Sequence, residues 1–148
     1  MEGGLKALVE ASFGTIWVYE DYFLISTIPG HVIGRQDFGE LMMMKLEHYA
    51  ERPVCAIHDN RHNSMSSFGE LTLIDRLCAE YRVIGLVVVV GHPRRVREYM
   101  SRRLVMRNTD YRLAVSVEEA FAIAEQIMKA SRAGPERAQS GGPPQPRG

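Results

Sequence analysis

The sequence has no net charge, few cysteines and no apolar run of membrane length, and each shortage excludes a class of protein. Its 18 basic side chains balance 18 acidic ones, so no overall charge attracts the chain to nucleic acid or to an anionic membrane. The apolar run at 83–90 is far shorter than the roughly 20 residues of a membrane span. The N-terminal residues lack the basic start and apolar core of a signal peptide. We therefore expect a cytoplasmic protein with no nucleic-acid partner.

The two cysteines, Cys55 and Cys78, lie in apolar segments without a Cys-x-x-Cys spacing. This pattern is typical of reduced, buried thiols. His58 and His62 could join Cys55 or Asp59 as metal ligands, but strand alternation points Cys55 and His58 to opposite faces. The sequence therefore predicts no metal site and no cofactor.

Common catalytic motifs are also missing. There is no glycine-rich phosphate loop and no Gly-x-Ser-x-Gly elbow, and Asp59 has neither the Asp-x-Asp spacing of a phosphatase nor the acidic pair of a receiver domain. We therefore expect no enzymatic activity. An active site built on the rim from Asp59 to His62 stays open as an alternative.

The strongest pattern present is the Val-rich run at 83–90, which ends in Gly91-His92-Pro93. A strand needs no polar alternation when both faces are covered, so the run predicts a central parallel strand of an α/β sheet. Ahead of it, the aromatic and branched residues of 14–20 and 22–28 predict an antiparallel hairpin, whereas 1–13 is ambiguous.

The remaining segments alternate between strand and helix patterns. Helices are expected at 37–50, where Asp37 and Glu40 resemble a capping box, at 67–81, at about 94–104, and after Ser116; strands are expected at 53–58 and 112–115. Residues 131–148 hold four Gly and four Pro and almost no large apolar side chain, which predicts a disordered tail. The expected fold is thus an α/β domain at 1–130 with a mixed sheet of four to five strands and about four helices.

This order of elements resembles the STAS superfamily, which includes the anti-sigma-factor antagonists and the SpoIIAA-like proteins. The resemblance covers about 14–128. Asp59-Asn60-Arg61 stands where antagonists carry Asp-Leu-Ser, and 65–71 (Met-Ser-Ser-Phe-Gly-Glu-Leu) stands where they carry Asp-Ser-Ser-Gly-Leu. The stretch 112–120 looks like the close of SpoIIAA-like sequences, a branch regarded as lipid- or ligand-binding. The resemblance implies a STAS-like fold.

In the antagonists a serine of this pair is phosphorylated by a partner kinase, so the resemblance implies Ser66 and Ser67 as phosphorylation candidates. Here Met65 replaces the preceding acid, and Ser67 alternatively caps the helix that follows. The partner-binding surface expected around the pair comprises Asp59, Asn60, Arg61, His62, Asn63, Ser64 and Gly69.

A second charged feature is the arginine-rich helix expected at 94–104. Arginine clusters suit acidic partners, although a solvated helix face explains the same pattern. An acidic protein surface or an anionic lipid would be its partner, and the basic patch comprises Arg94, Arg95, Arg97, Arg102 and Arg103.

These observations favour a non-enzymatic regulatory module that docks a kinase-like or other regulatory protein through 59–71. The alternative is a SpoIIAA-like protein that binds lipid or a small apolar ligand in a pocket between the sheet and the Met-rich helix, around Met42 to Leu46. Exposed edge strands in the hairpin would also allow a homodimer.

Overall fold

The computed structural model describes residues 4–62, 68–92, 100 and 105–141, with the backbone alone at 68, 69 and 134–141. The described elements are β1 (Ala7–Ala11), β2 (Gly14–Val18), β3 (Tyr22–Thr27), α1 (Arg35–Tyr49), β4 (Val54–Asp59), α2 (Phe68–Tyr81), β5 (Val83–Val89), β6 (Asp110–Ala114) and α4 (Val117–Gly141).

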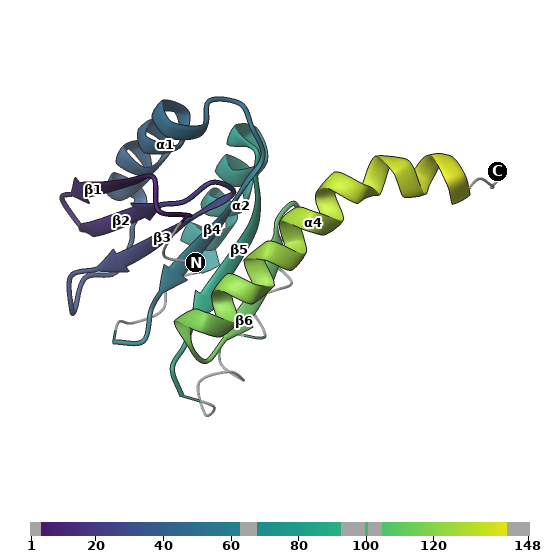
Figure 1. Cartoon of the computed structure of the whole chain (residues 1–148). Coiled ribbons are helices and arrows are strands. Elements are labelled where there is room, and N and C mark those ends of the chain that lie inside the picture. The colour runs from purple at the N-terminus through teal and green to yellow at the C-terminus, as the bar shows by residue number, and fades with distance from the viewer. Residues whose placement is uncertain (1–3, 63–67, 93–99, 101–104, 142–148) are drawn as a thin grey trace.

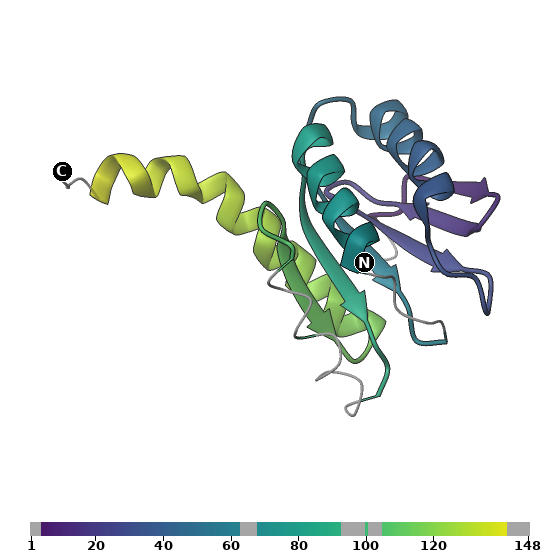
Figure 2. The same ribbon diagram turned by 180° about the vertical axis from the view of Figure 1, so that it is seen from behind.

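The six strands form one mixed sheet in the order β1-β2-β3-β4-β5-β6. Pairing is antiparallel from β1 to β3 and parallel from β3 to β6. Helices α1 and α2 cover one face, and α4 covers the other (Figures 1 and 2). The α/β class and the mixed sheet are confirmed. The sheet has six strands instead of four to five, and three helices are described where about four were expected.

Strand β1 was not predicted, because only a few of its side chains are large. In the structure, its residues alternate between exposed and half-buried positions. Leu8 and Glu10 are exposed, while the alternate residues are half-buried against the face that α1 covers. Because β1 pairs along β2, the free edge at this end of the sheet belongs to β1 and not to the predicted hairpin of β2 and β3.

Strand β5 occupies the predicted run and lies between two parallel neighbours. Val87 and Val89 pack toward α4, and Leu86 and Val88 pack on the α1 and α2 face. Gly85 permits close packing here, because a Cβ would stand 3.0 Å from both Cys55 Sγ and Ile127 Cγ2. The full covering of both faces explains the unbroken apolar sequence.

The start of α1 differs from the expected capping box. The helix begins two residues earlier, with Gly34 as N-cap, and Asp37 accepts hydrogen bonds from Gly34 N (3.0 Å) and His31 Nε2 (2.9 Å). Glu40 instead accepts from the hydroxyl of Ser12 (2.6 Å). The extended backbone of Gly34 ends the preceding loop, so Asp37 is the third residue of the helix and not its first.

Helix α4 begins as predicted, with Ser116 Oγ accepting from Glu119 N (3.1 Å). Its backbone stays helical to Gly141, past the point at Ser131 where the tail was expected to begin. Gly134 and Pro135 disfavour helix interiors, which is why composition places the end earlier. Residues 142–148 lie outside the described part, and the end of α4 projects beyond the sheet (Figure 1).

Candidate ligand pocket

A cavity lies between the sheet and the helix pair α1 and α2. Its floor is made of side chains in register across neighbouring strands, because every second residue of a strand faces the same side. One row runs Phe23, Ala56, Leu86 and Tyr111, and the next runs Ile25, His58 and Val88. The methyl group of Ala56 is by far the smallest side chain in these rows, so the floor is hollowed there.

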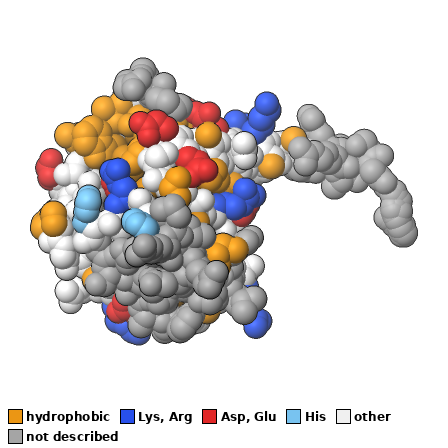
Figure 3. Space-filling view, turned by 90° about the horizontal axis from the view of Figure 1, so that it is seen from below, with side chains coloured by type: hydrophobic (Ala, Val, Ile, Leu, Met, Phe, Trp, Pro, Cys, Tyr) orange, Lys and Arg blue, Asp and Glu red, His pale blue; other side chains and the backbone are white. Residues whose placement is uncertain are grey.

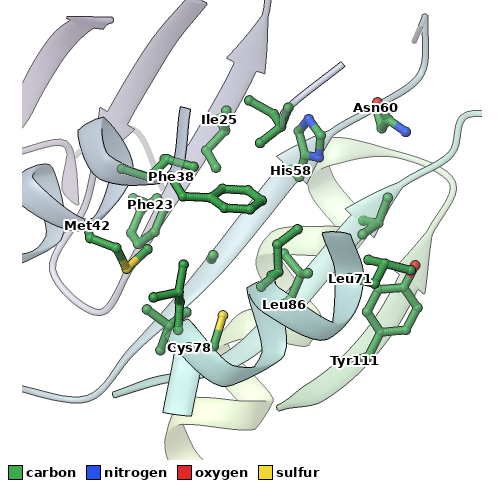
Figure 4. A pocket seen from close by; sticks show the side chains of 17 residues that line it. Phe23, Ile25, Phe38, Met42, His58, Asn60, Leu71, Cys78, Leu86 and Tyr111 are labelled. Atoms are coloured by element: carbon green, nitrogen blue, oxygen red, sulfur yellow. The ribbon is translucent and has the colours of Figure 1, made fainter. Parts of the chain in front are cut away.

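The walls come from the two helices. Helix α1 contributes Phe38, Leu41 and Met42, and α2 contributes four further side chains, which are Leu71, Ile74, Leu77 and Cys78 (Figure 4). The pocket is partly open to solvent and has a volume of about 90 Å³. Its described lining contains no charged side chain, and its polar members are His58, Asn60, Cys78 and Tyr111.

His58 is the unusual residue of the lining. The residue is half-buried, but its Nε2 is inaccessible to solvent and has no hydrogen-bond partner among the described residues. Burial lowers the pKa of the imidazole to about 4, against a small opposing effect of the Asp59 charge, so the ring is neutral at pH 7. Buried polar atoms without partners are rare in folded proteins, so this nitrogen carries a desolvation cost.

Asn60 lies beyond His58 at the same end of the pocket. The residue is buried, and its backbone N–H donates to Val89 O (3.0 Å), which extends the β4 to β5 pairing by one step. Asn60, which was predicted as part of a partner-binding surface, therefore lies in the pocket lining.

The rim outside the pocket is dominated by an ion pair. Arg61 Nε and Nη2 donate to the two carboxylate oxygens of Asp59 at 2.8 and 2.7 Å. Burial would raise the pKa of Asp59, but the hydrogen bonds and charge of Arg61 outweigh burial and hold this pKa below its usual value. A carboxylate so firmly ionised is a weak base, which counts against general acid–base chemistry at this rim.

Of the predicted site residues, Asp59 forms the ion pair at the rim and Asn60 lines the pocket. Arg61 and His62 are exposed where the chain leaves β4, and Gly69 lies in the first turn of α2. The face seen in Figure 3 shows histidine side chains close to hydrophobic and basic ones. The other predicted site residues lie outside the described residues: Asn63, Ser64, Ser66 and Ser67 of the loop, and Arg94, Arg95, Arg97, Arg102 and Arg103 of the basic patch.

Both cysteines are buried and free, as predicted. They lie on opposite sides of the sheet, because Cys55 of β4 packs toward α4 and Cys78 of α2 lines the pocket. Burial raises the pKa of each thiol to about 12, so neither is a thiolate nucleophile at neutral pH. Within the described ranges no group of three or more His, Cys, Asp or Glu could hold a metal ion.

The Met-rich helix was a useful signal for part of the pocket. Met42 lines the cavity, but Met43 and Leu46 of the same stretch are exposed. The contributions of Ala56 and His58 were missed, because they depend on the register of β4 against its neighbours and on the empty space above a small residue.

No family model, curated protein or solved structure matches the chain. Among the described helices, none combines the length and apolar character needed to cross a bilayer.

Proposed function

We propose that this domain binds a small, mainly apolar molecule in the pocket between its sheet and helices α1 and α2. The observation that carries the proposal is a pocket of about 90 Å³ whose described lining is mainly apolar and holds no charged side chain. Burial of a ligand's apolar surface against this lining is favourable. SpoIIAA-like ligand binding is also what part of the sequence resemblance implies.

The cavity size limits the ligand. It is smaller than the apolar cavity of about 150 Å³ that binds benzene, so a ligand of benzene's size or larger would be only partly enclosed. A longer ligand would have to extend between α1 and α2, beside the half-buried Met42 and Leu77.

The proposal is tested by titrating methyl-labelled protein with 1-hexanol, toluene and indole in turn, and following methyl resonances by NMR. Saturable shifts are expected at Leu71, Ile74 and Leu86, and none at Ile123, which lies on the α4 face. Ala56→Leu should fill the floor and abolish the shifts while keeping or raising the melting temperature. Met43→Leu, on the exposed side of α1, is the matched control. Absence of saturable shifts with all three probes would contradict the proposal.

We propose as a second candidate a regulatory protein-binding module that docks a kinase-like or other regulatory partner through 59–71. Arg61 and His62 are exposed just after the end of β4, and in the sequence they precede the segment that carries Ser66 and Ser67. The test compares partner capture from cell lysate by the wild type, Ser66→Asp and Ser67→Asp. A regulatory protein captured by the wild type and lost in either variant would favour this candidate, and identical capture would remove the phosphoserine switch.

A further inference from the structure

The outer edge of β1 is suited to pairing with a second copy of itself. Among the described residues, no strand lies beyond β1 in the sheet. On an edge strand, every second residue directs its N–H and C=O groups away from the neighbouring strand, where another strand can bind them. We propose that two copies of this chain dimerise by antiparallel pairing of their β1 strands about a two-fold axis at Leu8, which joins the two six-stranded sheets into one.

The first observation is an apolar row that reaches the edge at Leu8. Leu8 lies opposite Trp17 of β2, and Trp17 lies opposite Leu24 of β3, so the three side chains share one face of the sheet. Helix α4 covers this face over β4 to β6 but not over β1 (Figure 1), and Leu8 is 52% exposed. Pairing about Leu8 places the rows of the two copies end to end, so each Leu8 covers the other.

The second observation is the order of charges around Leu8. Lys6 and Glu10 lie two positions before and two positions after it. Lys6 precedes β1 by one residue, but its N–H donates to Val18 O (2.7 Å), so it continues the pairing with β2. In an antiparallel pair centred on Leu8, Lys6 of one copy therefore lies opposite Glu10 of the other, and this contact occurs twice.

These charges also select the register. Lys6 pairs with Glu20 at 3.3 Å within one chain, but both side chains are about 60% exposed, so exchanging this partner for another costs little. Centring the pair on Glu10 would instead set the two Glu10 side chains against each other, which is unfavourable. The charges therefore favour the axis at Leu8.

The other edge strand of the described sheet is less suited to pairing. Strand β6 carries Asp110 and Arg112, which form an ion pair at 2.7 Å. Charged side chains on an edge strand discourage pairing with another chain. The five residues of β1 include Glu10 as their single charged member, so we assign the dimer contact to β1.

Light scattering coupled to size-exclusion chromatography tests the dimer on the full chain, loaded at about 5 μM to about 500 μM. The mass should rise with concentration from 16.7 kDa toward twice that value. Leu8→Glu places two like charges at the axis and should raise the dimer dissociation constant at least about 10-fold. Met43→Glu, which changes a 66% exposed residue of α1, is the matched control and should leave the constant unchanged. Circular dichroism establishes that both variants are folded.

Further variants test the register. Glu10→Lys opposes like charges at both ends of the contact and should weaken the dimer roughly 5-fold, and adding Lys6→Glu to it should restore the affinity. Leu8→Cys should cross-link to its copy when oxidised with diamide, because facing residues of an antiparallel pair have Cα atoms about 4.5 to 5.5 Å apart, which a disulfide spans. Met43→Cys is the control and should not cross-link.

The outcomes decide the inference. A mass that stays at 16.7 kDa at every concentration overturns it. A dimer that Leu8→Glu does not weaken also overturns it, because its interface would lie elsewhere. If Leu8→Glu weakens the dimer but the charge exchange does not restore affinity and Leu8→Cys does not cross-link, the pairing about Leu8 is wrong. Ligand binding in the pocket is measured separately and does not depend on any of these results.

Discussion

At the scale of single residues, His58 connects stability to the chemistry of the pocket. Its desolvated imidazole is held neutral in the folded protein but titrates normally in the unfolded chain. This desolvation therefore makes the fold sensitive to acid. The effect disappears when the ring is replaced.

The first prediction concerns this acid sensitivity. The folded pKa of about 4 lies below the unfolded value of 6.5, so as the pH falls the unfolded state takes up a proton first. The His58 contribution to stability is thus complete above pH 6.5 and is lost as the pH falls toward 4, by roughly 3 kcal/mol. Urea unfolding of the wild type and His58→Leu from pH 7 to pH 4 measures the difference between their slopes. Equal slopes would show that His58 is not buried as a neutral ring.

Lys45 gives the second prediction. The side chain is fully buried in α1, and its Nζ donates to Ala50 O (2.7 Å) just past the end of the helix. Burial, and then the charge of Arg82, lower its pKa, so the folded state pays for keeping the ammonium charged. Lys45→Met keeps the chain length without the charge and is expected to be neutral or up to about 1 kcal/mol more stable in urea unfolding.

Lys45→Ala supplies the contrast to this substitution. It removes the charge but also leaves a cavity, and it should cost about 2 kcal/mol. A Met variant as unstable as the Ala variant would show that the hydrogen bond to Ala50 outweighs the desolvation of the ammonium.

At the scale of elements, α2 is connected to the sheet through Asp75. This buried carboxylate accepts from Arg107 N (3.0 Å), Asn108 N (3.0 Å) and Thr109 Oγ1 (2.8 Å), so it fixes the turn that leads into β6. Tyr111 of β6 ends one row of the pocket floor. Asp75 therefore holds the pocket side of β6 in place although it does not line the cavity.

The third prediction follows from this contact. Asp75→Ala removes a buried, charged acceptor that serves the backbone N–H groups of Arg107 and Asn108 and the hydroxyl of Thr109, and it should lower the unfolding free energy by about 3 kcal/mol. Asp110→Ala breaks an ion pair with Arg112 between two half-exposed side chains and should cost no more than about 0.5 kcal/mol. Similar losses in the two variants, measured by urea unfolding, would contradict the anchoring role of Asp75.

Prediction from sequence succeeded for elements with a complete local signal. The run at 83–90 has no polar interruption, and Ser116 and Glu119 are spaced as a helix cap; both appear in the structure. Strand β1 was not predicted, because an edge strand buries only one half-covered face and therefore lacks a strong hydrophobic pattern. The Met-rich helix predicted one wall of the pocket, but the floor could not be predicted. The local sequence does not show that Ala56 lies between Phe23 and Leu86, or that the space above Ala56 is open.

At the scale of the whole molecule, the sheet separates two packed layers with different roles. The α4 side is filled by aliphatic and aromatic side chains of β3, β4, β5 and α4. The other side holds the cavity between β3 to β6 and the pair of helices α1 and α2. The α4 layer can therefore supply stability while the opposite layer holds the pocket. Changes in α4 should alter the unfolding free energy without altering ligand affinity.

The last prediction tests this separation by shortening α4. Ala120, Ala124, Ile127 and Met128 pack inward, whereas 129–132 are exposed and Arg132 pairs with Asp21 at 3.1 Å. A chain ending at 133 keeps all these contacts, so its unfolding free energy should fall within about 0.5 kcal/mol of the full chain, with unchanged 1-hexanol binding. Ending the chain at 126 removes Ile127 and Met128 and should abolish cooperative unfolding. A loss above about 2 kcal/mol on ending at 133 would show that residues beyond it pack on the domain, and the division at 130 would then be wrong.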